Sequence, residues 1–166
     1  KNQPIDILTV VSRLKEKEMR LELLNALRKS AKDIRKDFEA TVSTWEHKPK
    51  FQEVISLGGN SPAVLVGSDD PIYRYVDEGT KAHIILPKKA KRLRFQGTYT
   101  AKTSPGVIGS GQGGSSGDVI YSKGVYHPGT KARKFSQAIE KKWQKAFKSR
   151  MEDAMQRARK KSGHAI

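Results

Sequence analysis

Two acidic pairs in the middle of the chain are the residues whose type and spacing come nearest to catalytic chemistry. Asp69-Asp70 and Asp77-Glu78 precede Lys81 by a short interval. Nucleases use carboxylates to hold a divalent cation and positive groups to stabilise the charge on phosphate. The spacing here is loose, and a proline directly after the first pair is more typical of a turn. A metal-dependent nuclease using Asp69, Asp70, Asp77 or Glu78 is therefore the weakest of three hypotheses.

The four histidines, at positions 47, 83, 127 and 164, do not form a metal-binding pattern. Zinc sites need ligands that converge, often as pairs at short fixed spacing, and no pair here has it. His83 and His127 flank the two copies of a repeated tetrapeptide and could meet in space. The chain has no cysteine, which excludes disulfides and thiolate chemistry. No nucleophile elbow stands out either, so the sequence predicts no catalytic residue, no cofactor and no metal.

The repeated tetrapeptide is GTKA, at residues 79–82 and 129–132. A phosphate-binding loop requires G-x-x-x-x-G-K-[ST], and neither copy supplies that spacing. In "HPGT" (127–130), proline fixes φ at the second position and glycine accepts a positive φ at the third, which predicts a type II turn. Thr130 would then be an N-cap-like acceptor before the last helix. "DEGT" (77–80) predicts a weaker turn. The flanks of the copies differ, which favours two Gly-Thr turns over a duplicated domain.

Two long amphipathic helices enclose this region. The first is predicted over 16–46, where apolar residues recur every three or four positions and a proline at 49 ends the pattern. The second is predicted over 134–161, where large apolar residues recur every four positions and the stripe drifts around the helix. It is long for so small a core, so part of it is expected to pack on another subunit. The two stripes comprise Leu21, Leu24, Leu27, Ala31, Ile34, Phe38, Val42 and Trp45, and Phe135, Ile139, Trp143, Phe147, Met151 and Met155.

Residues 50–126 read as a small, mostly antiparallel β-region. Strand-like runs are "FQEVISL", "AVLVG", "IYRYV", "HIIL", "RLRF" and "DVIYSKGVY", with a turn over 58–62. Residues 104–118 are rich in Gly and Ser and predict a long mobile loop. An ordered segment, strand or helix, is expected to begin at Pro4. The expected fold is thus a single α+β domain over residues 1–166.

The net charge of +16 comes from two segments. Residues 81–102 carry 7 basic and no acidic residues, and residues 131–166 carry 12 basic and 3 acidic residues. The first segment can neutralise phosphates without reading a base sequence, or it can protect an exposed strand edge with lysines. Both interpretations stay open. The second hypothesis is therefore a sequence-independent nucleic-acid-binding protein that uses residues 81–102 and the last helix. Its central cations are Lys88, Lys89, Lys91, Arg92 and Arg94.

Three motifs in order resemble a known family. "YRYVDEGT" (73–80), "PKKAKRLRF" (87–95) and "HPGTKARKF" (127–135) look like segments of the tail-completion or neck proteins of long-tailed bacteriophages. The resemblance covers about residues 70–147, and the Gly/Ser stretch departs from the family pattern. The motif residues that carry it are Gly79, Thr80, His127, Pro128, Gly129, Thr130 and Phe135.

The resemblance implies a structural virion protein without catalytic activity. Such a subunit forms a homo-oligomeric ring, expected to be a hexamer, at the head–tail junction or tail end. The ring would complete the tail tube and join it to the head connector. Genomic DNA would pass through its lumen, with transient and non-specific contact. The expected location is the phage neck or tail, assembled in the host cytoplasm, with no membrane association. This is the first hypothesis.

Overall fold

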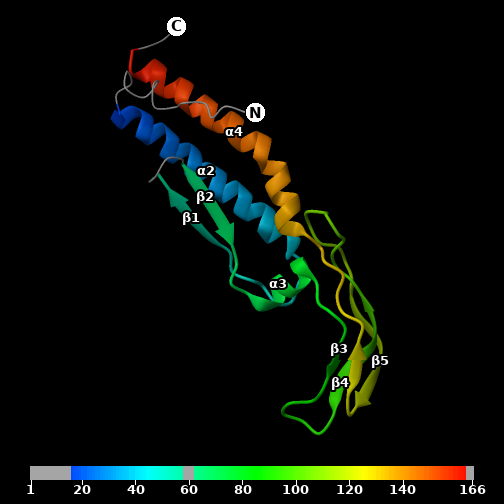
Figure 1. Ribbon diagram of the computed structural model, residues 1–166. Coiled ribbons are helices and arrows are strands. Elements are labelled where there is room, and N and C mark those ends of the chain that lie inside the picture. Colours follow the sequence, from blue (N-terminus) through cyan, green and yellow to red (C-terminus); the bar gives the residue numbers. More distant parts are fainter. Residues whose placement is uncertain (1–15, 58–61, 164–166) are drawn as a thin grey trace, which may run out of the picture. The chain divides into compact units, whose positions relative to one another are not determined.

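The structure is a computed structural model that describes residues 16–57 and 62–163 (Figure 1). It has the predicted α+β class, with long helices near both ends of the described chain and short antiparallel strands between them. The segment expected from Pro4 and most of the predicted turn over 58–62 lie outside the described residues. The elements are α2 (Glu16–Thr41), β1 (Gln52–Ser56), β2 (Ala63–Gly67), α3 (Pro71–Glu78), β3 (His83–Ile85), β4 (Leu93–Thr100), β5 (Gly114–Ser122), β6 (Val125–His127) and α4 (Phe135–Lys161).

The chain divides into two compact units. The first comprises Lys1–Ile34, Glu53–Val66 and Lys142–Ile166, and the second comprises Arg35–Gln52 and Gly67–Lys141. Both long helices contribute residues to each unit. Residues 16–34 of α2 and 142–161 of α4 belong to the first, and the adjoining ends of these helices belong to the second.

In the first unit, α2 and α4 run antiparallel and contact each other through small residues. Ala26, Ala31, Ala154 and Ala158 are buried, as is Ser30. Small side chains at such positions let two helix backbones approach closely. The predicted stripe on α4 therefore shifts along this helix: its large residues from 143 onward are only half-buried, while Ala154 and Ala158 are buried.

Charged side chains join the two helices at both ends of this contact. Glu22 on α2 is buried and accepts hydrogen bonds from Arg157 (3.0 Å) and Lys161 (2.5 Å) on α4. Further along, Arg150 pairs with Asp33 at 3.1 Å and also donates to the hydroxyl of Ser30. The bonds from Lys161 and then Arg157 hold the pKa of the Glu22 carboxyl below its ordinary value.

The core of the second unit is a cluster of aromatic rings around Tyr73 of α3. Its ring centroid lies 5.1 Å from Phe51, 6.0 Å from Phe135, 6.2 Å from Phe38 and 6.3 Å from Trp45. Tyr73 is 4% exposed and Phe135 is fully buried. Four separate chain segments thus meet on one side chain, and aromatic pairs at these distances add to the stabilisation from burial.

The strands form three two-stranded sheets rather than one sheet. β1 pairs with β2, β3 with β6, and β4 with β5. In the second unit, β3 and β6 are antiparallel with His83 opposite His127, and β4 and β5 are antiparallel with Phe95 opposite Ile120. We call these two pairs the β3–β6 ribbon and the β4–β5 ribbon. A two-stranded sheet buries little and is only marginally stable by itself.

Three sequence predictions need correction. The first helix ends at Thr41 and not at residue 46, because the N–H groups of Val42 and Ser43 bond to carbonyls three residues back instead of four. The Lys48 ammonium then binds the carbonyls of Val42 and Ser43 just past the helix end. The run "IYRYV" is helical and not a strand, because it lies within α3. The predicted mobile loop over 104–118 is partly a strand: its last five residues belong to β5.

The rest of the Gly/Ser stretch is held by hydrogen bonds to the turn after α2. The hydroxyl of Ser110 accepts from the backbone N–H of Thr44 at 3.1 Å. The hydroxyl of Thr44 in turn donates to the carbonyl of Gly111 at 2.8 Å, and the Lys102 ammonium donates to the carbonyl of Thr44. Small side chains here let the loop lie close to the turn after α2.

We predict that Glu22→Gln lowers the free energy of unfolding by about 1–2 kcal/mol at neutral pH, because two charge-assisted hydrogen bonds are lost. Thermal or denaturant unfolding measures this loss. The folded-state pKa of Glu22 is lowered, so its stabilisation is complete above the ordinary carboxyl pKa and decreases as the pH falls through the folded value. The difference between wild type and variant should therefore shrink in acid.

The matched control for this prediction is Glu152→Gln. Glu152 makes only an exposed i,i+4 pair with Lys148 at 4.0 Å on α4, so its loss should change stability by less than about 0.5 kcal/mol. Equal effects of the two variants, or a difference that grows in acid, would contradict the prediction.

Candidate functional site: the junction of the GTKA segments

The two GTKA segments contact each other in space. Thr80 and Thr130 form an isolated antiparallel bridge, in which each backbone N–H donates to the carbonyl of the other at 2.9 and 3.1 Å. The hydroxyl of Thr80 also accepts from the N–H of Thr130 at 2.9 Å. The β3–β6 ribbon continues the same antiparallel register. The tetrapeptides therefore form the base of this ribbon, and we call residues 73–80 and 127–136 the GTKA junction.

Both glycines of the junction are required by backbone proximity. Gly79 has φ 80° and Gly129 has φ 93°, the region that favours glycine. A Cβ on Gly129 would lie 2.3 Å from the carbonyl oxygen of Thr80. A Cβ on Gly79 would lie 2.6 Å from the carbonyl oxygen of Thr130. The positive φ of Gly129 fits the predicted type II turn. Each GTKA copy thus supplies a glycine whose missing side chain leaves room for the backbone of the other copy.

The first and third motifs of the family resemblance converge at this junction. Tyr73 opens the first motif and Phe135 closes the third, and their rings are in contact in the aromatic cluster. Between them, the N–H of Arg133 donates to the carbonyl of Val76. This bond satisfies a carbonyl near the end of α3 that has no partner within that helix. The middle motif lies elsewhere, in the β3–β4 connection and β4.

Asp77, rather than Thr130, accepts hydrogen bonds at the start of α4. Its carboxylate accepts from the backbone N–H of Ser136 at 3.3 Å and from the Ser136 hydroxyl at 2.6 Å. A negative group beside a helix N-terminus is also favoured by the helix dipole. The sequence prediction of an N-cap-like Thr130 is therefore wrong, because α4 begins only at Phe135 and Thr130 is bonded to Thr80.

His83 and His127 meet, as the sequence suggested they could. They are opposite each other in the ribbon and their ring centroids lie 5.1 Å apart. Nδ1 of His83 lies 2.8 Å from the carbonyl oxygen of Lys81, and Nδ1 of His127 accepts from the N–H of Gly129. The first bond requires a proton on Nδ1 of His83 and the second requires none on Nδ1 of His127. Each ring is thus fixed in a different tautomer by its own turn.

The acidic pairs are divided between structural and exposed positions. Asp70 is the N-cap of α3, where its carboxylate accepts from the N–H of Tyr73 at 2.9 Å and contacts Nε2 of His47 at 2.5 Å. The bond from Tyr73 and then that from His47 lower the pKa of the Asp70 carboxyl. The exposed members are Asp69 and Glu78. Among the described residues, no group of three or more His, Asp or Glu side chains could hold a metal ion.

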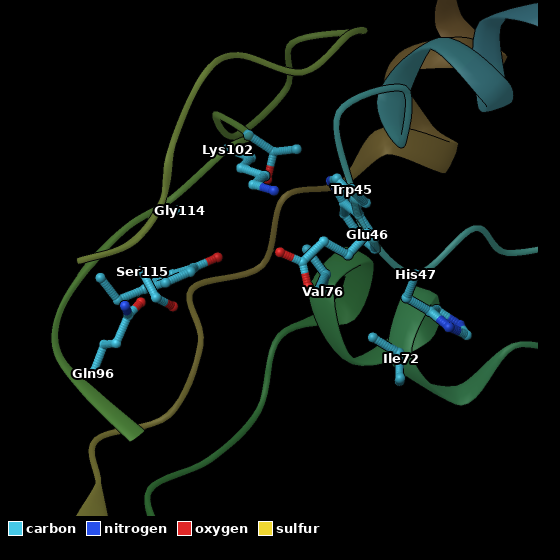
Figure 2. Close-up of a pocket in the computed structure, with 11 residues that line it drawn as sticks. Trp45, Glu46, His47, Ile72, Val76, Gln96, Lys102, Gly114 and Ser115 are labelled. Carbon is cyan, nitrogen blue, oxygen red and sulfur yellow. The ribbon is translucent and has the colours of Figure 1, made fainter. Parts of the chain in front are cut away.

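A cavity of about 330 Å³ lies beside α3 (Figure 2). One wall comprises Trp45, Glu46 and His47 with two side chains of α3, and the other comprises residues of β4 and β5. Figure 2 shows the carboxylate of Glu46 directed into the space between the walls, and Ser115 on the wall opposite His47.

The five central cations lie outside the junction. Lys88, Lys89, Lys91 and Arg92 belong to the β3–β4 connection, and Arg94 is on β4 opposite Tyr121. All five are exposed. The structure neither joins them to the motif turns nor gives them an ion pair within the described part of the chain.

Large apolar side chains are exposed on the ribbons beside these cations. Ile84 and Tyr126 are opposite each other on the β3–β6 ribbon and are 68% and 69% exposed. Further exposed apolar residues are Leu86, Phe95, Tyr99, Val119, Ile120 and Tyr121. Contiguous exposed apolar surface on a monomer usually marks an interaction site. Neither long helix in the described residues has an apolar stretch sufficient to span a bilayer.

Comparison with known protein families, curated proteins and solved structures finds no match to this chain. The family resemblance therefore depends on the three sequence motifs alone.

Sequence reasoning missed the roles of Asp77, Tyr73 and Glu46. Nothing in the sequence indicates that an acidic residue of one helix accepts from the N-terminus of another, because the two are far apart in the chain. A signal for α3 was present: an aspartate directly before a proline is a typical helix start. Placing α3 correctly would have directed Tyr73 towards the core.

We predict that Gly129→Ala lowers the free energy of unfolding by about 2–4 kcal/mol, because the new Cβ adds backbone strain and displaces the carbonyl of Thr80. Denaturant unfolding followed by circular dichroism measures the loss. The matched control is Gly106→Ala, since Gly106 has φ 71° but open space around its Cβ position. That control should cost only about 1 kcal/mol. Similar losses in both variants would show that the junction is not the cause.

Proposed function

We propose that this chain is a structural subunit of a tailed bacteriophage. It assembles with copies of itself into a ring, expected to be a hexamer, at the head–tail junction or tail end of the virion. The ring completes the tail tube and joins it to the head connector, and DNA passes through its lumen. The subunit has no catalytic activity and needs no cofactor.

The observation that carries this proposal is the convergence of two separate family motifs on one junction. Tyr73 contacts Phe135, Thr80 pairs with Thr130, and the two glycines admit each other. The first and third motifs of the resemblance thus hold the base of the same ribbon. A resemblance by chance would not require its motif residues to be in mutual contact.

The distribution of chemistry-bearing side chains also supports an assembly role. The inner acidic residues and the paired histidines are used in hydrogen bonds that hold turns and helix ends. The ribbons and the β3–β4 connection, in contrast, present exposed large apolar residues and exposed cations. Surfaces of this composition are typical of protein contacts rather than of catalytic sites.

Mass measurement and electron microscopy of the purified chain, alone and mixed with phage tail tubes, test the proposal. We expect ring-shaped particles that attach to one end of the tubes, because a terminator binds only the exposed end of a finished tube. Tubes without the chain are the control. A monomer that leaves tube ends bare would contradict the proposal.

A second candidate function is sequence-independent binding of nucleic acid. The observation in its favour is the exposure of Lys88, Lys89, Lys91, Arg92 and Arg94 in a segment without acidic residues. Such a cluster releases counterions when it neutralises phosphates, so affinity falls steeply with salt.

We predict that replacing these five cations by glutamine weakens binding to a mixed-sequence duplex and flattens its salt dependence by about 0.9 per lost phosphate contact. Fluorescence anisotropy at several salt concentrations measures both effects. The control replaces five exposed cations of α2 by glutamine and changes the net charge equally: Lys17, Arg28, Lys29, Lys32 and Lys36. Equal weakening by both variants would indicate only a general effect of charge, and no binding by the wild type would exclude this function.

A further inference from the structure

We propose that the β3–β6 ribbon of one copy docks on helix α3 of a second copy, in a head-to-tail contact. The proposal rests on the proposed function only in expecting that copies of this chain assemble. It adds which surfaces meet and the symmetry of their contact. Both surfaces belong to the second unit of the chain.

The docking surface on the first copy is one face of the β3–β6 ribbon. Ile84 and Tyr126 are a cross-strand pair, and Leu86 follows two residues after Ile84. Successive side chains alternate between faces of a strand, so Ile84 and Tyr126 share a face, and Leu86 continues it. Their exposed fractions are 68%, 69% and 62%. We call these three residues the ribbon face.

The ribbon face needs a cover that the described part of the chain does not provide. The ribbon is one of the two-stranded sheets, and no third strand pairs with it among the described residues. Isolated two-stranded sheets are marginal in water. Burying three large apolar side chains against a partner removes their apolar surface from water and so stabilises the ribbon.

The receiving surface on the second copy is an exposed ridge of α3. Asp69, Ile72, Tyr75 and Glu78 are spaced by three residues, and all four are exposed. Residues at i and i+3 are neighbours on a helix surface, and Asp69 stands just before the helix. Ile72 is 47% and Tyr75 52% exposed, and in the chain Asp69 precedes these two apolar residues and Glu78 follows them. We call these four residues the α3 ridge.

Charge complementarity identifies a second copy as the occupant. Residues 81–102, which include the end of the ribbon, carry 7 basic and no acidic residues. Residues 67–80, which contain the α3 ridge, carry 4 acidic residues and 1 basic residue. Two ribbons would therefore repel each other, whereas a ribbon and a ridge attract. The one basic side chain there, Arg74, lies over the Tyr75 ring at 5.9 Å and leaves the outer carboxylates exposed.

The cavity beside α3 extends the receiving surface. Ile72 lies on the α3 ridge and also lines the cavity, and the Glu46 carboxylate is directed into that space. A lysine from the β3–β4 connection of the docked copy can pair with Glu46 there. Because ribbon and ridge are different surfaces, every docked copy leaves one of each free. Contacts of this kind close into rings or continue as filaments.

A charge exchange tests the proposal. In the ribbon variant, Lys88→Glu and Lys89→Glu reverse the ribbon end, and in the ridge variant, Asp69→Lys and Glu78→Lys reverse the ridge. Sedimentation velocity of the full chain at low salt measures self-association. We expect each variant alone to associate at least about tenfold more weakly than the wild type, because like charges then face each other.

The decisive sample is the equimolar mixture of the two variants. In alternating order, each reversed ribbon meets a reversed ridge and each native ribbon meets a native ridge, so association should return to nearly the wild-type level. A ridge variant that assembles normally, or a mixture that stays dissociated, would overturn the head-to-tail contact.

The apolar part is tested by Ile84→Ser combined with Tyr126→Ser. We expect self-association to be lost while the helical circular dichroism is kept, because both side chains are exposed in the single chain. Leu65→Ser on β2 of the first unit is the matched control, since Leu65 is also 68% exposed, and it should leave association unchanged. The proposal would be overturned if the wild type is monomeric and the double variant melts at a lower temperature than the wild type. That result would show that Ile84 and Tyr126 are covered within a single chain.

These outcomes are separable from those of the proposed function. If association follows the charge exchange but the particles leave tail tubes unbound, the docking contact stands and the phage function fails. If rings bind tubes but ignore the charge exchange, the function stands and the docking contact fails.

Discussion

The second unit depends on the burial of one side chain, Tyr73. Its ring is in contact with four other aromatic rings that come from the end of α2, the turn after it, the start of β1 and the start of α4. Burial also raises the pKa of its phenol, because the charged form would lose its hydration. The position of the ring is fixed by its backbone, since the N–H of Tyr73 is bonded to the cap residue Asp70. A local capping bond thus helps to hold the residue around which the other four rings lie.

The junction follows from that cluster. With Phe135 packed on Tyr73, the segment before α4 must pass the end of α3, where Asp77 accepts from Ser136 and holds the start of α4. The two GTKA turns are then brought together, and only glycine fits at such backbone distances. The β3–β6 ribbon continues from this contact with its register already fixed. The ribbon that extends from this base exposes Ile84 and Tyr126.

The sequence predicts the elements with strong local signals and fails where distant contacts decide. Apolar periodicity over four or more turns identified both long helices. The predicted turn at Pro128 and Gly129 required a positive φ at the glycine, and Gly129 has one. The short helix α3 was missed because "IYRYV" alternates like a strand, and the cap at Asp70 outweighs that pattern. The end of α2 depends on Lys48, and the hydrogen-bond partner of the α4 start is on another helix. Neither relation is visible in a local window.

The division of the acidic pairs indicates why this surface is suited to assembly. In each pair, the inner residue is held by the fold: Asp70 caps α3, and Asp77 binds the start of α4. The outer residues, Asp69 and Glu78, are exposed on the α3 ridge. A carboxylate already bonded to backbone N–H groups contributes little to a new contact, whereas an exposed one is available to a cation. The same helix that orders the core therefore presents acidic charge outward, while the ribbon that grows from the junction presents basic charge. In the proposed head-to-tail contact, that separation of sign on one unit sets the direction in which copies of this chain would join.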